Sequence, residues 1–230
     1  MSNTFRVFHY RNYSYFFFGQ LVSRLGTWMQ RTAVLWVVYQ MTHSLLMVGI
    51  ATFAEQFPSF VLSPLAGITA DRYNRNKVVI VTQLVSALQA VLLTLFYFIG
   101  WHYVWLILGL SLVLGIANAF DIPARQAMVN ELVEDPALLP GAIAMNASMN
   151  NFARLAGPAL AGLVLAVYGA SACFAANALS FTAVIYCLFQ LKVPPLESVE
   201  KGKKTWSNFR EGLNYIKTGA KSAPRSCWWV

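Results

Sequence analysis

Four charged side chains interrupt the apolar runs of this chain: Arg24, Arg31, Glu55 and Arg154. A charge at membrane depth is costly, and it usually faces a protein interior or a water-filled cavity. The three arginines would form a cationic cavity for an anionic ligand, and Glu55 would be a carboxylate that binds and releases a proton. The alternative is structural, because the same charges would also tie neighbouring helices together.

The depths of these charges follow from the 1.5 Å rise per residue of an α-helix. Arg24 lies ~16 Å from one end of its apolar run and Arg154 ~20 Å from the corresponding end of its own run, which places both near the bilayer centre. Arg31 and Glu55 each lie ~12–15 Å from the opposite side, at a depth where they can pair. Arg24 and Arg31 are seven residues apart and share one helix face.

A second charged group lies between two long apolar runs and contains Gly67, Asp71, Arg72, Arg75 and Lys77. The connection is so short that it predicts a tight hairpin between two membrane helices. Three cations with one anion indicate the side of the membrane that retains positive charge, the cytoplasm. Asp71 lies at the C-terminal end of a helix, where the helix dipole disfavours a carboxylate. It therefore needs a partner, either Arg72 and Arg75 or the N-terminus of a neighbouring helix.

Small residues follow Arg154 in the same apolar run. They are Gly157, Pro158, Ala161 and Gly162. Because small residues remove side-chain bulk, this pattern lets a neighbouring helix approach closely. We therefore interpret Gly157, Pro158 and Gly162 as helix-packing positions.

The composition indicates a polytopic membrane protein. Of 230 residues, 57% are hydrophobic and 11% are charged, whereas a soluble domain has about 25% charged residues. The net charge of +8 gathers at the ends of apolar runs and in the tail, which favours a membrane surface over nucleic acid as the partner. The histidines and cysteines have no metal-ligand spacing, and no phosphate-binding glycine loop with lysine is present. We expect no metal, no cofactor and no enzymatic activity.

Six apolar runs are long enough to cross the ~30 Å apolar layer of a bilayer as helices, which predicts an all-α membrane protein. They cover residues 13–39, 45–70, 78–99, 104–120, 141–168 and 172–191. The third run is almost wholly apolar and is expected to face lipid. Asp121 and Arg125 would form an ion pair at the end of the fourth run, and residues 126–140 would form a short surface helix.

Three domains follow from these runs: a basic arm over residues 1–12, a six-helix bundle over residues 13–191, and a basic linker or tail over residues 192–230. Lysine and arginine gather in the arm, the hairpin, the segment after the fourth run and the tail. The opposite turns contain neither. This distribution predicts that both termini are cytoplasmic.

Several motifs resemble one branch of a transporter superfamily. The hairpin is similar to the G-x-x-x-D-R-x-x-R-x-K loop of the major facilitator superfamily, with Asn74 where that family usually has glycine. The enterobactin-exporter-like branch has motifs similar to SRLGTWMQ at 23–30, YQMTHS at 39–44, ANAFDIPARQA at 117–127 and RLAGPALAG at 154–162. That branch includes siderophore exporters and drug efflux proteins.

The resemblance implies twelve helices in two six-helix halves, with a substrate bound between the halves near the bilayer centre. This chain would supply the N-terminal half of a proton-coupled exporter of a small molecule, such as a siderophore or a drug, in a bacterial inner membrane. The resemblance also implies that Gly67, Asp71, Arg72 and Arg75 latch the two halves on the cytoplasmic side. The glycines at 157 and 162 belong to an element that implies export.

In the family, a segment like residues 211–217 is followed by a seventh helix. In this sequence the residues after 217 differ from that pattern. We expect a truncated product whose partner is the missing C-terminal half, or alternatively a half-size transporter that pairs with a second copy. A non-transporting membrane fragment is the competing function. The other expected partners are a small-molecule substrate, membrane lipid and the proton as coupling ion, with no nucleic acid.

Overall fold

The computed structural model describes residues 3–133 and 135–191, apart from the side chains of residues 3–5 and of Asp71. The long helices are α1 (Arg11–Thr42), α2 (Leu45–Arg72), α3 (Arg75–Phe98), α4 (Val104–Leu132), α5 (Leu139–Tyr168) and α6 (Ala170–Gln190). Two short 3-10 helices, η1 (Asn3–His9) and η2 (Pro136–Leu138), precede α1 and α5. No strand occurs among the described residues, which confirms the all-α class. The predicted tail lies outside them.

Five of these helices, α2 to α6, are long and apolar enough to cross a membrane. Within the described part of the chain, α1 does not meet the same standard of length and composition, so six apolar spans were predicted and five are found. The reason is that α1 contains three arginines and buries Gln20, Ser23 and Gln30. These polar side chains lower its mean hydropathy although they face the protein interior.

Helix α4 extends to Leu132, past its predicted end at residue 120. Pro123 lies inside α4 without ending it, as proline does in membrane helices whose neighbours can satisfy the freed backbone group. The last turns bury Met128, Val129 and Leu132 in an apolar cluster. The surface helix predicted over residues 126–140 is therefore wrong, since this segment is divided among the end of α4, η2 and the start of α5.

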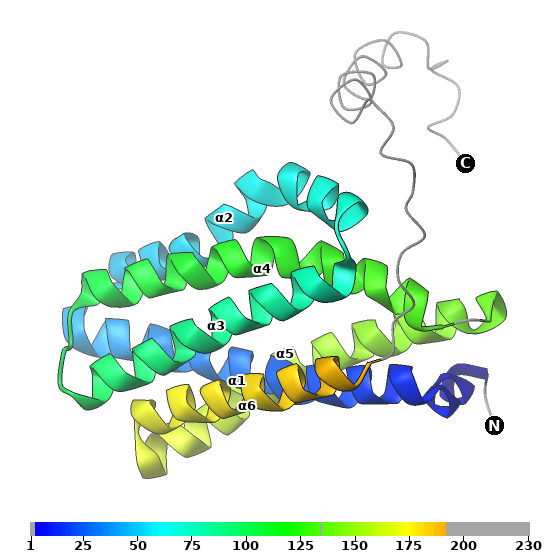
Figure 1. The fold of residues 1–230 in the computed structure, drawn as a ribbon. Helices are drawn as coiled ribbons and strands as arrows, with labels where there is room; N and C mark the ends of the chain where they lie inside the picture. The colour runs from blue at the N-terminus through cyan, green and yellow to red at the C-terminus, as the bar shows by residue number, and fades with distance from the viewer. Residues whose placement is uncertain (1–2, 134, 192–230) are drawn as a thin grey trace, which may run out of the picture. The chain divides into compact units, whose positions relative to one another are not determined.

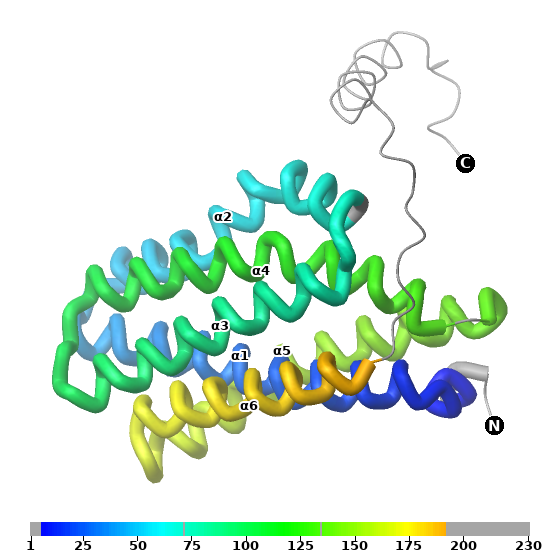
Figure 2. Tube along the Cα trace, viewed as in Figure 1, coloured from blue at the N-terminus to red at the C-terminus, as the bar shows by residue number. Residues whose placement is uncertain are grey.

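The helices pack in two groups that share α3 (Figure 1). Helix α1 packs mainly against α5 and α6, while α4 packs between α2 and α3. Helix α3 also packs against α6 and so joins the groups. Helix α2 bends in its second half, where Pro58 and Pro64 lie inside it (Figure 2), as expected when proline removes a helical hydrogen bond. Helix α2 makes few contacts with α3, because α4 packs between them.

Glycines form two of the turns. Gly100 and Gly169 have φ angles of 88° and 78°, which glycine adopts without steric cost. At the other end of the bundle, the α2–α3 turn is closed by Asn74, whose side-chain oxygen accepts from the Lys77 N–H at 3.2 Å. We call the end that contains this turn the hairpin end.

Two apolar clusters fill the interior. One is near the hairpin end and includes Tyr13, Phe16 and Leu188. The other is near the opposite end and includes Val37 and Phe174. On α1, α3, α4 and α6, buried polar side chains lie mainly between the residues that belong to the two clusters. The bundle therefore has a polar layer between two apolar layers.

Candidate functional site

Arg31 on α1 and Glu55 on α2 form a bidentate ion pair. Arg31 Nη2 lies 2.7 Å from Glu55 Oε1, and Arg31 Nε lies 3.0 Å from Oε2 and 3.1 Å from Oε1. Bidentate guanidinium–carboxylate pairs fix geometry as well as charge. The carboxylate is buried and the guanidinium is partly exposed. The pair that the depth estimate allowed is thus present in the structure.

A close contact between α2 and α4 positions the backbone of Glu55. A Cβ on Gly115 would lie closer than 3 Å to the Glu55 carbonyl oxygen and 3.1 Å from Pro58 Cγ. A residue without a side chain is needed for α4 to approach this far. The Ser59 hydroxyl donates to the Gly115 carbonyl at 3.3 Å across the same contact. The position of the carboxylate therefore depends on a glycine of another helix.

The Trp28 indole faces two arginines of different helices. The guanidinium carbon of Arg31 lies 4.6 Å from the ring centroid, and that of Arg154 lies 6.0 Å from it. Both distances are within cation–π range. Trp28 was missed in the sequence analysis, although its spacing of three residues from Arg31 places the two on neighbouring positions of one helix face. It is the side chain that brings α1 and α5 together at this level.

The small residues of α5 differ in how closely other helices approach them. Gly157 lies against Trp28, because a Cβ on Gly157 would overlap the Trp28 Cβ atom. Pro158 lies inside α5 without ending it. A Cβ on Gly162 would meet no described atom within 4 Å. Within this bundle the close approach is therefore at Gly157, and a packing role for Gly162 stays a prediction.

Arg24 forms no ion pair with a carboxylate in the described part of the chain. Its Nε atom is buried and has no hydrogen-bond partner there. Arg24 lies within electrostatic reach of both Arg31 and Arg125, and each of these is paired with an acid. Arg154 is exposed on α5, also without a described carboxylate partner. The excess positive charge of this region thus rests on Arg24 and Arg154.

Asp121 and Arg125 form an ion pair in the interior, and not at a helix end as predicted. Their exposed fractions are 2% and 4%. Asp121 Oδ1 accepts from the Thr82 hydroxyl and the Gln83 amide, both at 3.0 Å, and Arg125 donates to Gln20. The pair therefore joins α1, α3 and α4. The sequence signal that was overlooked is the polar side chains that α3 contributes.

Helix α3 does not simply face lipid, as its apolar composition had suggested. It buries a polar face that includes Gln83, Ser86 and Gln89. The Gln30 amide donates to Gln89 Oε1 at 3.0 Å, and the Asn177 amide donates to Gln30 Oε1 at 2.8 Å. Side-chain amides thus link α1, α3 and α6 at the level between the apolar clusters.

The residues predicted to form a gating loop lie in the last turns of α2 and at the start of α3, on either side of the α2–α3 turn, and their gating role stays a prediction. Arg75 Nη1 lies 2.5 Å from Glu131 Oε1 on α4, a partner that the sequence analysis did not identify because the two residues are far apart in the chain. Arg72 is exposed, and a Cβ on Gly67 would have open space. The Asp71 side chain lies outside the described residues, so the partner expected for it stays a prediction.

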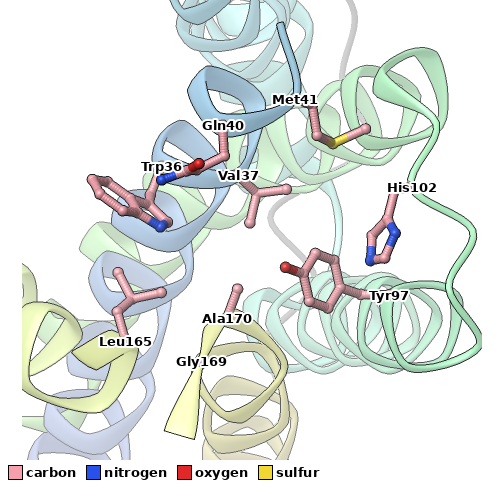
Figure 3. A pocket seen from close by; sticks show the side chains of 9 residues that line it. All are labelled: Trp36, Val37, Gln40, Met41, Tyr97, His102, Leu165, Gly169 and Ala170. Carbon is pink, nitrogen blue, oxygen red and sulfur yellow. The ribbon is translucent and has the colours of Figure 1, made fainter. Parts of the chain in front are cut away.

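A pocket of about 360 Å³ opens at the end of the bundle opposite the hairpin end (Figure 3). Its lining comes from Trp36, Val37, Gln40, Met41, Tyr97, His102, Leu165, Gly169 and Ala170. The Tyr97 and His102 rings meet edge to face, with centroids 4.6 Å apart. Since it contains no arginine, lysine or carboxylate, this pocket differs in chemistry from the arginine region.

Comparison with known proteins identifies relatives over most of the chain. The model of a family described as transmembrane secretion effector, one of the major facilitator families, matches residues 2–223. A staphyloferrin A transporter of Staphylococcus aureus is 33% identical over 176 residues, which are 76% of this chain and 44% of that protein. A macrolide efflux protein of Streptococcus pyogenes is 25% identical over 77% of this chain and 44% of its own length. A putative bacilysin exporter of Bacillus amyloliquefaciens is 25% identical over 91% of this chain and 52% of its own.

The chain thus spans about half the length of the curated relatives it matches. These three relatives are named as a transporter, an efflux protein and an exporter. At the level of the family, the similarity therefore points to transport and not to enzymatic activity.

Proposed function

The chain belongs to the transmembrane secretion effector family of the major facilitator transporters, and from this premise we propose that its six helices form the N-terminal half of a secondary active exporter. Two observations support the proposal. Five helices have the length and composition of membrane spans, and the relatives are about twice as long as the matched region. In this proposal α1 also crosses the membrane, since its polar and charged side chains largely face the protein interior.

The exported molecule is a small anion, and it binds where Trp28 faces α5. The observation that carries this assignment is the excess positive charge on Arg24 and Arg154 together with the half-buried Trp28 indole, which Arg154 faces. Guanidinium groups bind carboxylates through charge-assisted hydrogen bonds, and an indole can stack on a planar group of the same ligand. The relatives are named for staphyloferrin A, macrolides and bacilysin, so a siderophore or a drug with an acidic group is the substrate class.

Proton coupling is assigned to Glu55. When this carboxylate binds a proton, it loses its charge and the ion pair with Arg31 loses its electrostatic attraction. Arg31 is then free to attract an anion from the cavity, next to Trp28. Release of the proton restores the pair, and Glu55 then competes with the anion for Arg31. In this scheme proton binding and anion binding are coupled, because both act on the same arginine.

The hairpin end is the cytoplasmic end and contains the gate. Gly67, Asp71, Arg72 and Arg75 form the latch between the two halves, and Glu131 extends it to α4 through its ion pair with Arg75. The surplus of cations in this turn places it on the inner face of a bacterial inner membrane. Both termini are then cytoplasmic.

The transport cycle needs a second six-helix half, supplied by a C-terminal half or by a second copy of this chain. In its absence the bundle is a non-transporting membrane fragment, which is the competing function. Such a fragment would still contain Arg24, Trp28 and Arg154. Ligand binding is therefore the property to measure, because the side chains of the proposed site all lie within this bundle.

The test compares an acid with its neutral isostere. The purified chain, in lipid nanodiscs, is titrated with 2,3-dihydroxybenzoate and with 2,3-dihydroxybenzamide, and dissociation constants are measured by equilibrium dialysis. Loss of a hydrogen bond to a charged group costs about 1.5–3 kcal/mol, so Arg24→Gln or Arg154→Gln should weaken binding of the acid roughly ten- to hundredfold. Binding of the amide should change little. Arg6→Gln, at an exposed cation of η1, is the control.

Equal losses for the acid and the amide would show that the two arginines are structural. The same affinity of the unmodified chain for both ligands would contradict the anionic substrate class.

A further inference from the structure

A groove at the hairpin end is separate from the arginine region. It has a volume of about 440 Å³ and lies among the end of α2, the first half of α3 and the middle of α4. Its lining consists of Thr69, Tyr73, Asn74, Lys77, Val78, Val81, Thr82, Val85, Ile116, Ala117 and Phe120. Helix α2 contains Pro58 and Pro64 and is bent (Figure 1). It makes few contacts with α3.

The chemistry of the groove changes along its length. Val78, Val81 and Val85 follow one another along α3, and Ile116 and Phe120 face them from α4. This part offers aliphatic and aromatic surface to an occupant. From Lys77 to Val85 the rise along α3 is about 12 Å. A hydrocarbon chain that enters beside Lys77 can therefore lie against apolar side chains for roughly that distance.

The polar end of the groove contains one cation. Lys77 is exposed, and in the described part of the chain it forms no ion pair. The neighbouring cation Arg75 is different, because it is paired with Glu131. The positive charge of the Lys77 ammonium is therefore available to an anionic group outside this bundle. Because Lys77 lies at the start of a candidate membrane span, that group lies at the boundary between lipid and water.

We propose that the groove binds one anionic phospholipid, with its phosphate at Lys77 and one acyl chain along Val78, Val81 and Val85. Charge complementarity selects the headgroup, and the apolar lining selects the chain. A long basic side chain at a membrane boundary is well suited to an anionic headgroup, since such contacts contribute about 1 kcal/mol per residue near the surface.

The bound lipid also protects the buried ion pair of α4. Thr82 lines the groove, and its hydroxyl donates to Asp121 Oδ1 at 3.0 Å. Thr82 is therefore both part of the groove wall and a hydrogen-bond partner of the carboxylate. An acyl chain in the groove excludes water from the Thr82 side, so the ion pair stays dry. The lipid therefore stabilises the bundle independently of any transported ligand.

Thermal unfolding of the purified chain in dodecyl maltoside tests the proposal. Unfolding is followed while phosphatidylglycerol, or phosphatidylcholine with the same acyl chains, is added in small molar excess. Phosphatidylglycerol should raise the midpoint temperature more than phosphatidylcholine. In Lys77→Gln the two lipids should act alike, with an apparent affinity for phosphatidylglycerol about fivefold weaker, whereas Arg6→Gln should keep the preference.

A second pair of variants tests the acyl-chain part of the groove. Val81→Trp fills the groove and should remove the stabilisation by phosphatidylglycerol, whereas Val91→Trp, at another exposed valine of α3, should leave it unchanged. Glycerol 3-phosphate should not replace the lipid. The proposal is overturned if both lipids stabilise the unmodified chain equally, which is also the result expected if a protein helix occupies the groove. Stabilisation by glycerol 3-phosphate alone, or an unchanged lipid response in Val81→Trp, would also overturn it.

Discussion

Replacing Gly115 by alanine tests how closely α2 and α4 must approach at Glu55. The added Cβ would lie closer than 3 Å to the Glu55 carbonyl oxygen and 3.1 Å from Pro58 Cγ. Neither atom is the end of a flexible side chain, so the two helices must separate or tilt. Gly109 is the matched control because it lies in the same helix and a Cβ there would meet no described atom within 4 Å.

The expected difference can be estimated from two terms. Alanine is the better helix former by about 1 kcal/mol, and this gain applies to both variants. It therefore cancels when the two are compared. Overpacking of a tight contact costs about 1–3 kcal/mol, and only Gly115→Ala incurs it. Gly115→Ala should therefore be less stable than Gly109→Ala by about 1–3 kcal/mol.

The assay is reversible unfolding of the purified chain in mixed micelles, followed by circular dichroism as the denaturing detergent fraction increases. Both variants are measured against the unmodified chain. Gly109→Ala should unfold at the same detergent fraction or a higher one, and Gly115→Ala at a lower one. If the two variants have the same midpoint, α4 does not hold Glu55 through this glycine, and the packing argument is refuted.

Three further predictions concern other parts of the bundle. Asp121→Asn leaves a buried arginine without its partner and should destabilise the chain by about 3–5 kcal/mol in the same unfolding assay; a loss below about 1 kcal/mol would show that the pair is solvated. A double-mutant cycle with Arg75→Gln and Glu131→Gln should give a coupling energy of about 0.5–1 kcal/mol, whereas additive effects would show that the pair contributes nothing. A membrane-impermeant maleimide applied to intact cells should label a cysteine placed at His102 and not one placed at Asn74, and the reverse labelling would contradict the proposed orientation.

The helices themselves were predictable because apolar length is a strong signal. A run of about 20 apolar residues needs a helix to satisfy its backbone in lipid, and all six predicted runs are helices in the structure. The pairing of Arg31 with Glu55 was also accessible, since depth along a straight helix follows from residue number. These inferences use only local geometry.

The polar interior was not predictable in the same way. The average hydropathy of α3 conceals Gln83 and Gln89, because which face a side chain occupies depends on the neighbouring helices. The fourth helix was predicted to end near residue 120, whereas α4 continues past Pro123 to Leu132 and buries residues on both sides of the proline. Glu131 was missed because its partner lies 56 residues earlier in the chain. The buried face of α3, the length of α4 and the partner of Arg75 all depend on contacts between residues that are far apart in the sequence.

The sequence also did not show which arginines keep their charge available. Arg24 and Arg31 share one helix face, and a carboxylate partner was predicted only for Arg31. The structure distinguishes them, because Arg31 is paired with Glu55 while the Arg24 Nε atom has no described partner. The contact of Trp28 with Arg154 depends on the packing of α5 against α1, which places the Arg154 guanidinium over the indole ring.

The most direct test of the anion site is whether a bound acid is detected by Trp28. Tryptophan fluorescence is recorded while 2,3-dihydroxybenzoate is added to the unmodified chain, to Trp28→Phe and to Trp36→Phe, with Trp36 reporting on the pocket of Figure 3. The proposed site predicts a saturable quench in the unmodified chain and in Trp36→Phe that is absent in Trp28→Phe. A quench that persists in Trp28→Phe, or that disappears in Trp36→Phe alone, would contradict it.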